Sequence, residues 1–134
     1  MKRIVNFGFL ILILMFSNCS SDIKLENYIN KTEPLVLIIN TTNSDTKLTE
    51  TKSVKLEVNS DKWKKLVDWG NNNQEGWTSS PASHIGDIYV SQGDFRLTHS
   101  IDSKGIVIAF KDKDGNPKQY INDVKKGELN FLYE

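Results

Sequence analysis

Short apolar segments separated by turn residues follow one another along the chain from residue 35 onward. Residues 35–39 form a continuous run of β-branched residues and leucine, and residues 106–110 form a second apolar run. Runs of this length bounded by polar turn residues are typical of buried strands. Residues 53–58 alternate between polar and apolar side chains, the period of two that places one face of a strand in a core. The pattern predicts a domain dominated by strands.

One segment, residues 60–69, has the helical period instead. Asn59 or Ser60 can cap this helix, and Gly70 is expected to end it. The apolar side chains on its inner face are those of Trp63, Leu66 and Val67.

A meander of strands is predicted after this helix and the long loop at residues 71–83. In the second arm of its first hairpin, Phe95, Leu97 and His99 occupy the inward positions. The expected strands cover residues 88–90, 95–99, 106–110, 118–121 and 129–133. We therefore expect an α+β fold in which an antiparallel sheet of about six to seven strands packs against one short helix, in a single domain at residues 35–134.

The start of the chain has the three-part plan of a secretory signal. Lys2 and Arg3 precede an apolar run at residues 4–16, and small or polar residues follow. A helix of that run spans roughly 20 Å, short of the roughly 30 Å hydrocarbon core of a membrane. The run therefore predicts a signal segment, and no stable membrane span.

The only cysteine, Cys19, comes directly after this segment, and a lone cysteine forms no internal disulfide. The run Phe16-Ser17-Asn18-Cys19 resembles a bacterial lipobox, with Phe16 where Leu is usual and Asn18 where Gly, Ala or Ser is usual. The resemblance implies cleavage after residue 18, a diacylglyceryl group on the Cys19 thiol and acylation of the new amino terminus. The other interpretation is a conventional secretory signal followed by a free thiol.

The lipobox resemblance also implies an organisation and a location. Residues 1–18 are then a signal peptide, and the polar residues 19–34 a tether from the lipid to the domain. Multiple acyl chains make an effectively permanent anchor in a bacterial envelope membrane. Ser20 stands where an Asp retains the best-known lipoproteins at the inner membrane, so the outer membrane is favoured.

Charge and motifs exclude several classes of function. Without the signal segment, 15 basic residues face 17 acidic ones, and this net charge of −2 argues against nucleic-acid binding. The sequence at residues 112–116 has alternating carboxylates but is typical of a hairpin turn, because Ile121 stands where a calcium loop needs Glu. We expect no metal site and no cofactor, and no catalytic constellation is recognisable.

Aromatic and amide side chains gather between residues 69 and 85, which makes this region the candidate binding site. Such side chains stack on sugars or anchor a protein partner. The alternative is that Trp77 folds back onto the core, as large aromatic side chains in loops commonly do. The candidate residues are Trp69, Trp77, Asn72 and His84.

The first functional hypothesis is a lipid-anchored, non-enzymatic binding module with a protein or glycan partner in the envelope. The alternative is an immunity or inhibitor protein directed against a toxin or a lytic enzyme. An envelope enzyme is the third, since fold class alone excludes no chemistry.

Overall fold

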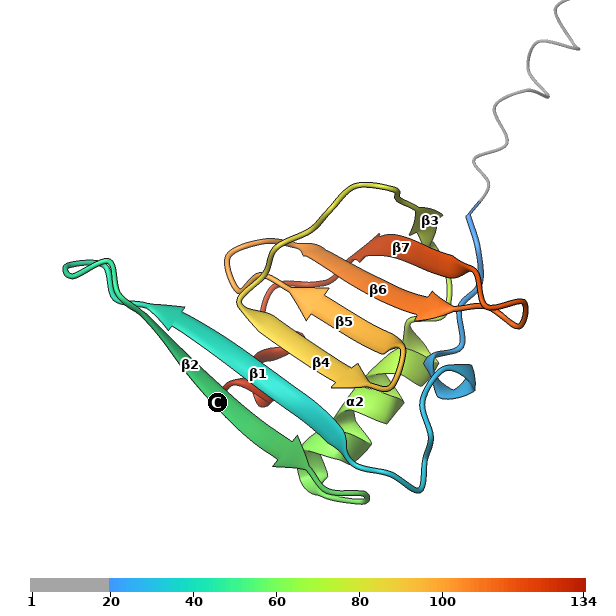
Figure 1. Ribbon diagram of the computed structural model, residues 1–134, viewed down its shortest axis with the longest axis horizontal. Coiled ribbons are helices and arrows are strands. Elements are labelled where there is room, and N and C mark those ends of the chain that lie inside the picture. Colours follow the sequence, from blue (N-terminus) through green and yellow to red (C-terminus); the bar gives the residue numbers. More distant parts are fainter. Residues whose placement is uncertain (1–19) are drawn as a thin grey trace, which may run out of the picture.

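The computed structural model describes residues 20–134, so the expected signal peptide and Cys19 lie outside the described residues. The elements in chain order are η2 (Leu25–Asn27), β1 (Leu35–Thr42), β2 (Thr49–Leu56), α2 (Asp61–Asn72), β3 (Thr78–Ser79), β4 (Ile88–Gln92), β5 (Phe95–His99), β6 (Gly105–Lys111), β7 (Pro117–Asp123) and η3 (Asn130–Leu132). Figure 1 shows their arrangement.

The strands form one seven-stranded sheet in the order β2-β1-β4-β5-β6-β7-β3, and all of its pairs are antiparallel. The expected antiparallel sheet with one helix is therefore confirmed, although α2 is small beside the sheet. The expected meander corresponds to β4 through β7, which pair in succession.

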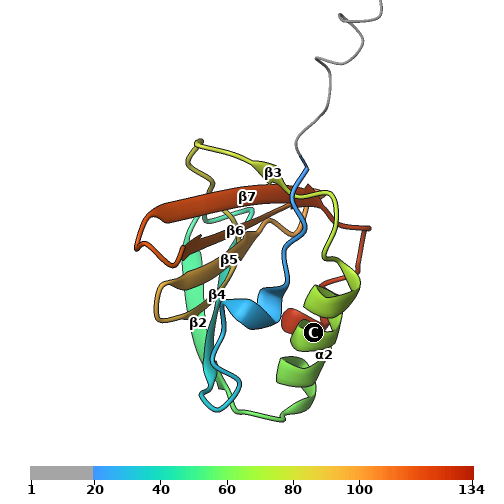
Figure 2. The ribbon, with the colours of Figure 1, turned by 90° about the vertical axis from the view of Figure 1, so that its right-hand side faces the viewer.

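Within residues 20–134, helices cover only one face of the sheet. Figure 2 shows α2, η2 and the carboxyl-terminal segment on the same side of the sheet. The core lies between these layers because alternate strand residues point toward α2, among them Leu37, Val90, Leu97 and Ile108, each at most 1% exposed. The inward positions predicted for β5, Phe95, Leu97 and His99, are confirmed as buried.

The helix is longer than expected. Ser60 is its N-cap residue, but Gly70 lies inside α2, which continues to Asn72. The prediction that Gly70 ends the helix is therefore wrong. Gly70 is buried and faces Leu25, so it serves close packing at this point.

The amino-terminal segment also differs from the expected tether at residues 19–34. Ser21 bridges to Trp77, and the N–H of Ile23 donates to the Gln74 carbonyl oxygen at 2.7 Å. The ring of Tyr28 stacks on Phe110, with centroids 3.6 Å apart. The core includes Ile23, Leu25 and Ile29. Within the described residues, the folded body thus begins at Ser21 and not at residue 35.

The predicted last strand at residues 129–133 is wrong. The segment forms the 3-10 helix η3, in which the N–H of Leu132 donates to the Leu129 carbonyl oxygen at 3.0 Å. Leu129 and Leu132 are both fully buried, and Lys62 in α2 donates its ammonium to the Leu132 carbonyl oxygen. Burial against α2 explains the apolar pattern that resembled a strand.

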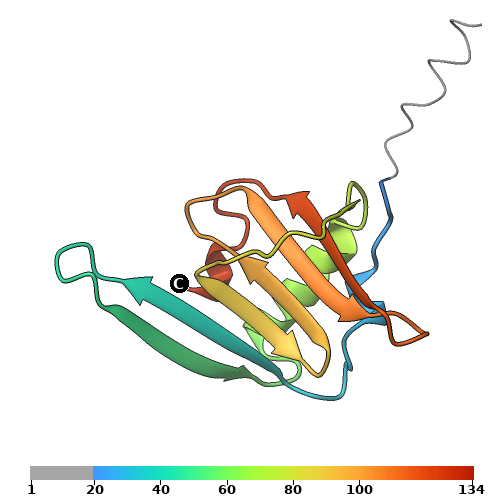
Figure 3. The same cartoon turned by 45° about the horizontal axis from the view of Figure 1, so that its top comes forward.

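A two-stranded arm projects from the sheet. β1 pairs with β4 only over Val36–Ile39, whereas its pairing with β2 continues to Thr42 and Thr49. Figures 1 and 3 show this hairpin extending away from the body, on the side opposite the amino-terminal segment.

Candidate functional site

The face of the sheet opposite α2 carries the candidate site, and we call it the open face. Residues directly opposite each other in neighbouring strands point to the same face. One row of such residues crosses the open face from β1 to β7: Val36, Ser91, Arg96, Ala109 and Gln119. Arg96 is exposed near the middle of this row.

A segment that we call the bridging loop, residues 80–87, runs between β3 and β4 across this face (Figure 1). Its first half is held by Gln119, whose side-chain amide donates to the carbonyl oxygens of Ser80 at 2.9 Å and Ala82 at 2.5 Å. The N–H of Ser80 donates to the Gln119 carbonyl oxygen at 3.1 Å. β7 therefore holds this half of the loop through both side-chain and backbone groups.

The second half of the bridging loop is held at Asp87. Its carboxylate accepts hydrogen bonds from the Ser100 hydroxyl at 2.8 Å and from the N–H of Ile101 at 2.9 Å. Its own N–H donates to the His99 carbonyl oxygen at 3.0 Å. At Gly86 the backbone approaches so closely that a Cβ atom would lie 2.5 Å from the same oxygen. The loop is thus fastened at both ends.

The bridging loop shields part of the open face. Val107 and Thr98 point to this face, yet each is only 7% exposed. Both line a cavity of about 80 Å³ together with His84 and Ile85. The loop therefore lies over these two side chains.

Ile85 is the most exposed large apolar side chain among the described residues, at 91%. Ser100 lines the same cavity as Ile85, and the next residue, Ile101, is 38% exposed. Both isoleucines therefore stand at one end of the open face, beside the Asp87 hydrogen bonds. Ile85 belongs to the bridging loop and Ile101 to the turn between β5 and β6, and the Asp87 carboxylate joins the two segments.

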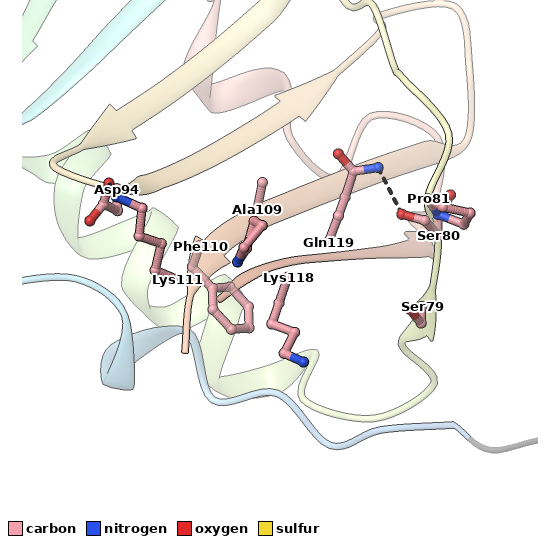
Figure 4. Close-up of a pocket in the computed structure, with 10 residues that line it drawn as sticks. Ser79, Ser80, Pro81, Asp94, Ala109, Phe110, Lys111, Lys118 and Gln119 are labelled. Atoms are coloured by element: carbon pink, nitrogen blue, oxygen red, sulfur yellow. Dashed lines mark hydrogen bonds and ion pairs between the residues drawn. The ribbon is translucent and has the colours of Figure 1, made fainter. Parts of the chain in front are cut away.

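A groove of about 570 Å³ lies beside the first half of the loop (Figure 4). Ala109 and Gln119 contribute to it from the open face, and Ser80 from the loop. On its other side the Lys111 ammonium pairs with the Asp94 carboxylate at 2.9 Å. Its lining is mixed, with hydroxyl, amide and charged groups beside apolar ones, which suits a polar rim of an interface.

His84 is the one predicted site residue on the bridging loop. Its Nε2 lies 3.1 Å from the Ser80 hydroxyl oxygen. A serine nucleophile needs a histidine that a third group orients, and within residues 20–134 no carboxylate forms a hydrogen bond with His84. The contact instead ties the loop to itself. The other histidine, His99, is buried, and its Nδ1 lies 3.0 Å from the Gly105 carbonyl oxygen.

The two tryptophans expected to bind a ligand lie in the core. Trp69 is 7% exposed and Trp77 is 2% exposed, and their rings meet edge to face with centroids 6.5 Å apart. The Trp77 indole N–H donates to the Asn73 carbonyl oxygen at 2.8 Å. Their faces are therefore not available to a sugar or a partner. Trp77 therefore folds back onto the core, as the alternative interpretation of the sequence stated.

Asn72 is exposed but belongs to another part of the surface. It lines a polar depression formed by the end of α2 and by Asp22, close to where the folded body begins. His84 lines the cavity under the bridging loop instead. The structure therefore brings Trp69 and Trp77 together in the core but places Asn72 and His84 at separate parts of the surface.

The turn at residues 112–116 connects β6 and β7 as predicted. One oxygen of the Asp112 carboxylate accepts the N–H groups of Asn116 at 2.9 Å and Asp114 at 3.0 Å. These hydrogen bonds, first that of Asn116, hold the pKa of Asp112 below its usual value of 3.8, and Lys118 lowers it further. In residues 20–134 no three His, Cys, Asp or Glu side chains gather in a way that could hold a metal ion.

The region predicted from the sequence, residues 69–85, overlaps the bridging loop at residues 80–85, but the predicted site residues did not include Ile85. The signal that could have found Ile85 is an isoleucine set between His84 and Gly86 within a polar stretch. Such an isoleucine belongs to neither apolar period, so it has no predicted place in the core.

No family model matches the chain, and neither the curated proteins nor the solved structures contain a match to it. Of the helices in the described part, none is long and apolar enough to cross a membrane.

Proposed function

We propose that this chain is a lipid-anchored protein of the bacterial cell envelope that binds another envelope protein through the bridging loop, without catalysis. The observation that carries the proposal is the 91% exposure of Ile85 on a loop fastened at both ends. Single exposed apolar residues are common on protein surfaces. Ile85 differs because its loop is already ordered, which lowers the entropy lost when a partner binds.

A protein partner fits this surface better than a glycan. Sugar binding favours exposed aromatic faces, whereas Trp63, Trp69 and Trp77 are all buried. The bridging loop offers Ile85 instead, and the turn between β5 and β6 offers Ile101, while the mixed groove lies beside the first half of the loop. An apolar centre with a polar rim is the usual anatomy of a protein interface.

The anchor is proposed at Cys19, with the outer membrane favoured. Ser21 already bridges to Trp77, so a single residue, Ser20, separates Cys19 from the folded body. A lipid on Cys19 would therefore hold the domain directly at the membrane surface, with the arm at the far side (Figure 1). Mass spectrometry of the mature protein tests the anchor: a diacylglyceryl group on Cys19 is expected, and an unmodified thiol there would contradict it.

Photocrosslinking in intact cells tests the binding surface. A photoreactive amino acid replaces Ile85 in one variant and Leu48 in a control, because Leu48 is also a well-exposed apolar residue, at 68%, but lies by the arm turn. We expect a discrete protein adduct from position 85 that position 48 does not give. Absence of an adduct at 85, or the same adducts from both positions, would contradict the proposal.

The identity of the adduct also separates two kinds of partner. A resident envelope protein supports an interaction module. A toxin or a lytic enzyme, captured when it is supplied from outside, supports the immunity or inhibitor alternative.

A further inference from the structure

The outer edge of β2 is the longest free edge of the sheet. β2 is the terminal strand at one end, with eight residues, whereas β3 at the other end has two. An unpaired strand edge presents N–H and C=O groups in a row, ready to pair with another strand. Most of β2 is exposed, and over the arm β1 is its only neighbouring strand in the described part of the chain.

The hydrogen-bond pattern identifies the groups on this edge. The N–H of Asn43 donates to the Leu48 carbonyl oxygen at 2.9 Å. The N–H of Asn40 points to the other side of β1 and donates to the Asp87 carbonyl oxygen at 2.7 Å. Hydrogen-bonded and non-hydrogen-bonded pairs alternate along an antiparallel ladder. The backbone groups that point outward from β2 are therefore those of Thr49, Thr51, Ser53 and Lys55.

The side chains of β2 are complementary to themselves in one register. Two copies of β2 can pair antiparallel about a two-fold axis at Thr51. Glu50 of each copy then faces Lys52 of the other copy, so the pair of opposite charges occurs twice. A two-fold axis at residue 50 would instead place the two Glu50 side chains opposite each other, and an axis at residue 52 would do the same with the two Lys52 side chains. An axis at Ser53 sets Glu50 against Leu56.

The same register also uses the exposed apolar residue by the arm turn. Leu48, 68% exposed, then faces Val54 of the second copy, and Thr49 faces Ser53. Lys47 has a φ of 58° and lies in the turn, so the pairing ends before it. Within the described residues, neither Glu50 nor Lys52 has an ion-pair partner in its own chain.

We propose that the chain forms a two-fold symmetric dimer in which the β2 edges of two copies pair antiparallel about Thr51 and join their sheets. The occupant of this edge is a second copy of the chain because the Glu50 and Lys52 charges match their own symmetry mates. The surface is separate from the bridging loop, so either proposal can fail without the other.

Charge exchange in the full chain, solubilised in detergent, tests the dimer by analytical ultracentrifugation. E50K sets two lysine side chains against each other at both symmetric contacts and is expected to weaken dimerisation at least tenfold. E50K combined with K52E restores both contacts and is expected to restore the dimer. E75K is the matched control, since Glu75 is exposed and lies outside β2. A monomeric wild-type chain, or a dimer that E50K leaves unchanged, would overturn the proposal.

Cysteine cross-linking gives an independent readout of the register. Hydrogen-bonded antiparallel pairs have Cα atoms about 5.5 Å apart, within the range of about 4.4–6.8 Å that a disulfide spans. T51C should therefore form a disulfide dimer on mild oxidation, while T41C in β1 should not. Cys19 is common to both variants, so it does not produce the difference. Equal cross-linking of both variants would contradict a two-fold axis at Thr51.

Discussion

Leu25 fills the space beside α2 that a side chain at Gly70 would need. A Cβ atom on Gly70 would lie 2.5 Å from Leu25 Cδ2 and 2.6 Å from Leu25 Cβ. Helix propensity favours Ala over Gly by about 1 kcal/mol. Because Leu25 is buried and cannot move aside freely, G70A is expected to destabilise the domain by about 1–3 kcal/mol. Urea unfolding measures the change.

A double-mutant cycle separates this contact from a general loss of helix packing. L25A alone leaves a cavity, but it also makes room for a methyl group at residue 70. The combination L25A/G70A should therefore cost less than the two single changes together. Strict additivity would show that the two side chains do not compete for one space.

Trp77 closes the core, so its loss should affect folding. W77A removes a side chain that is 2% exposed together with its edge-to-face contact with Trp69, and we expect a loss of about 3–5 kcal/mol. W77F retains part of the packing but not the hydrogen bond to Asn73, so its cost should be intermediate. Thermal unfolding that is the same for W77A as for the wild type would contradict the core role.

The elements that could be predicted from the sequence are those whose apolar pattern is set by neighbouring residues in the chain. The β5 pattern is an example, since Phe95, Leu97 and His99 alternate with outward residues and are buried. The turn at residues 112–116 also follows from local turn chemistry. Ser60 precedes the helix as predicted, although its side chain makes no capping hydrogen bond.

The elements that the sequence did not predict depend on contacts between distant segments. Gly70 lies inside the helix and leaves room for Leu25, which is far away in sequence. The same contact turns the expected tether into part of the core. Trp77 is likewise buried, and it contacts the Trp69 ring and forms a β-bridge with Ser21. Composition alone does not reveal these contacts.

The hold of Gln119 on the bridging loop can be tested by hydrogen exchange. Q119A removes the donors to the Ser80 and Ala82 carbonyl oxygens, so the hydrogen-bonded loop amides of Ser80 and Gly86 should exchange faster while global stability changes little. Q92A is the matched control, because Gln92 instead donates to the carbonyl oxygens of Asn30 and Glu33. Unchanged exchange in the loop of Q119A would show that other contacts order it.

The Asp112 turn predicts a pH-dependent contribution to stability. Its pKa is lowered in the folded state, so the contribution is present above the ordinary value of 3.8 and is lost as the pH falls through the lower folded value. D112A should therefore be less stable than the wild type at pH 7, and the difference should shrink below about pH 3.8. Chemical unfolding at a series of pH values checks this, and a difference that does not depend on pH would contradict it.

Ile85 on the bridging loop is the proposed contact with the protein partner, and the affinity of an Ile85 variant for that partner tests this contact. I85D should bind the partner identified by crosslinking at least tenfold more weakly, about 1.4 kcal/mol, because a carboxylate would replace the apolar contact. Its unfolding midpoint should match that of the wild type, since the side chain is 91% exposed. N72D, which places a carboxylate at an exposed position outside both proposed surfaces, should bind the partner normally. Wild-type affinity for I85D would contradict the claim.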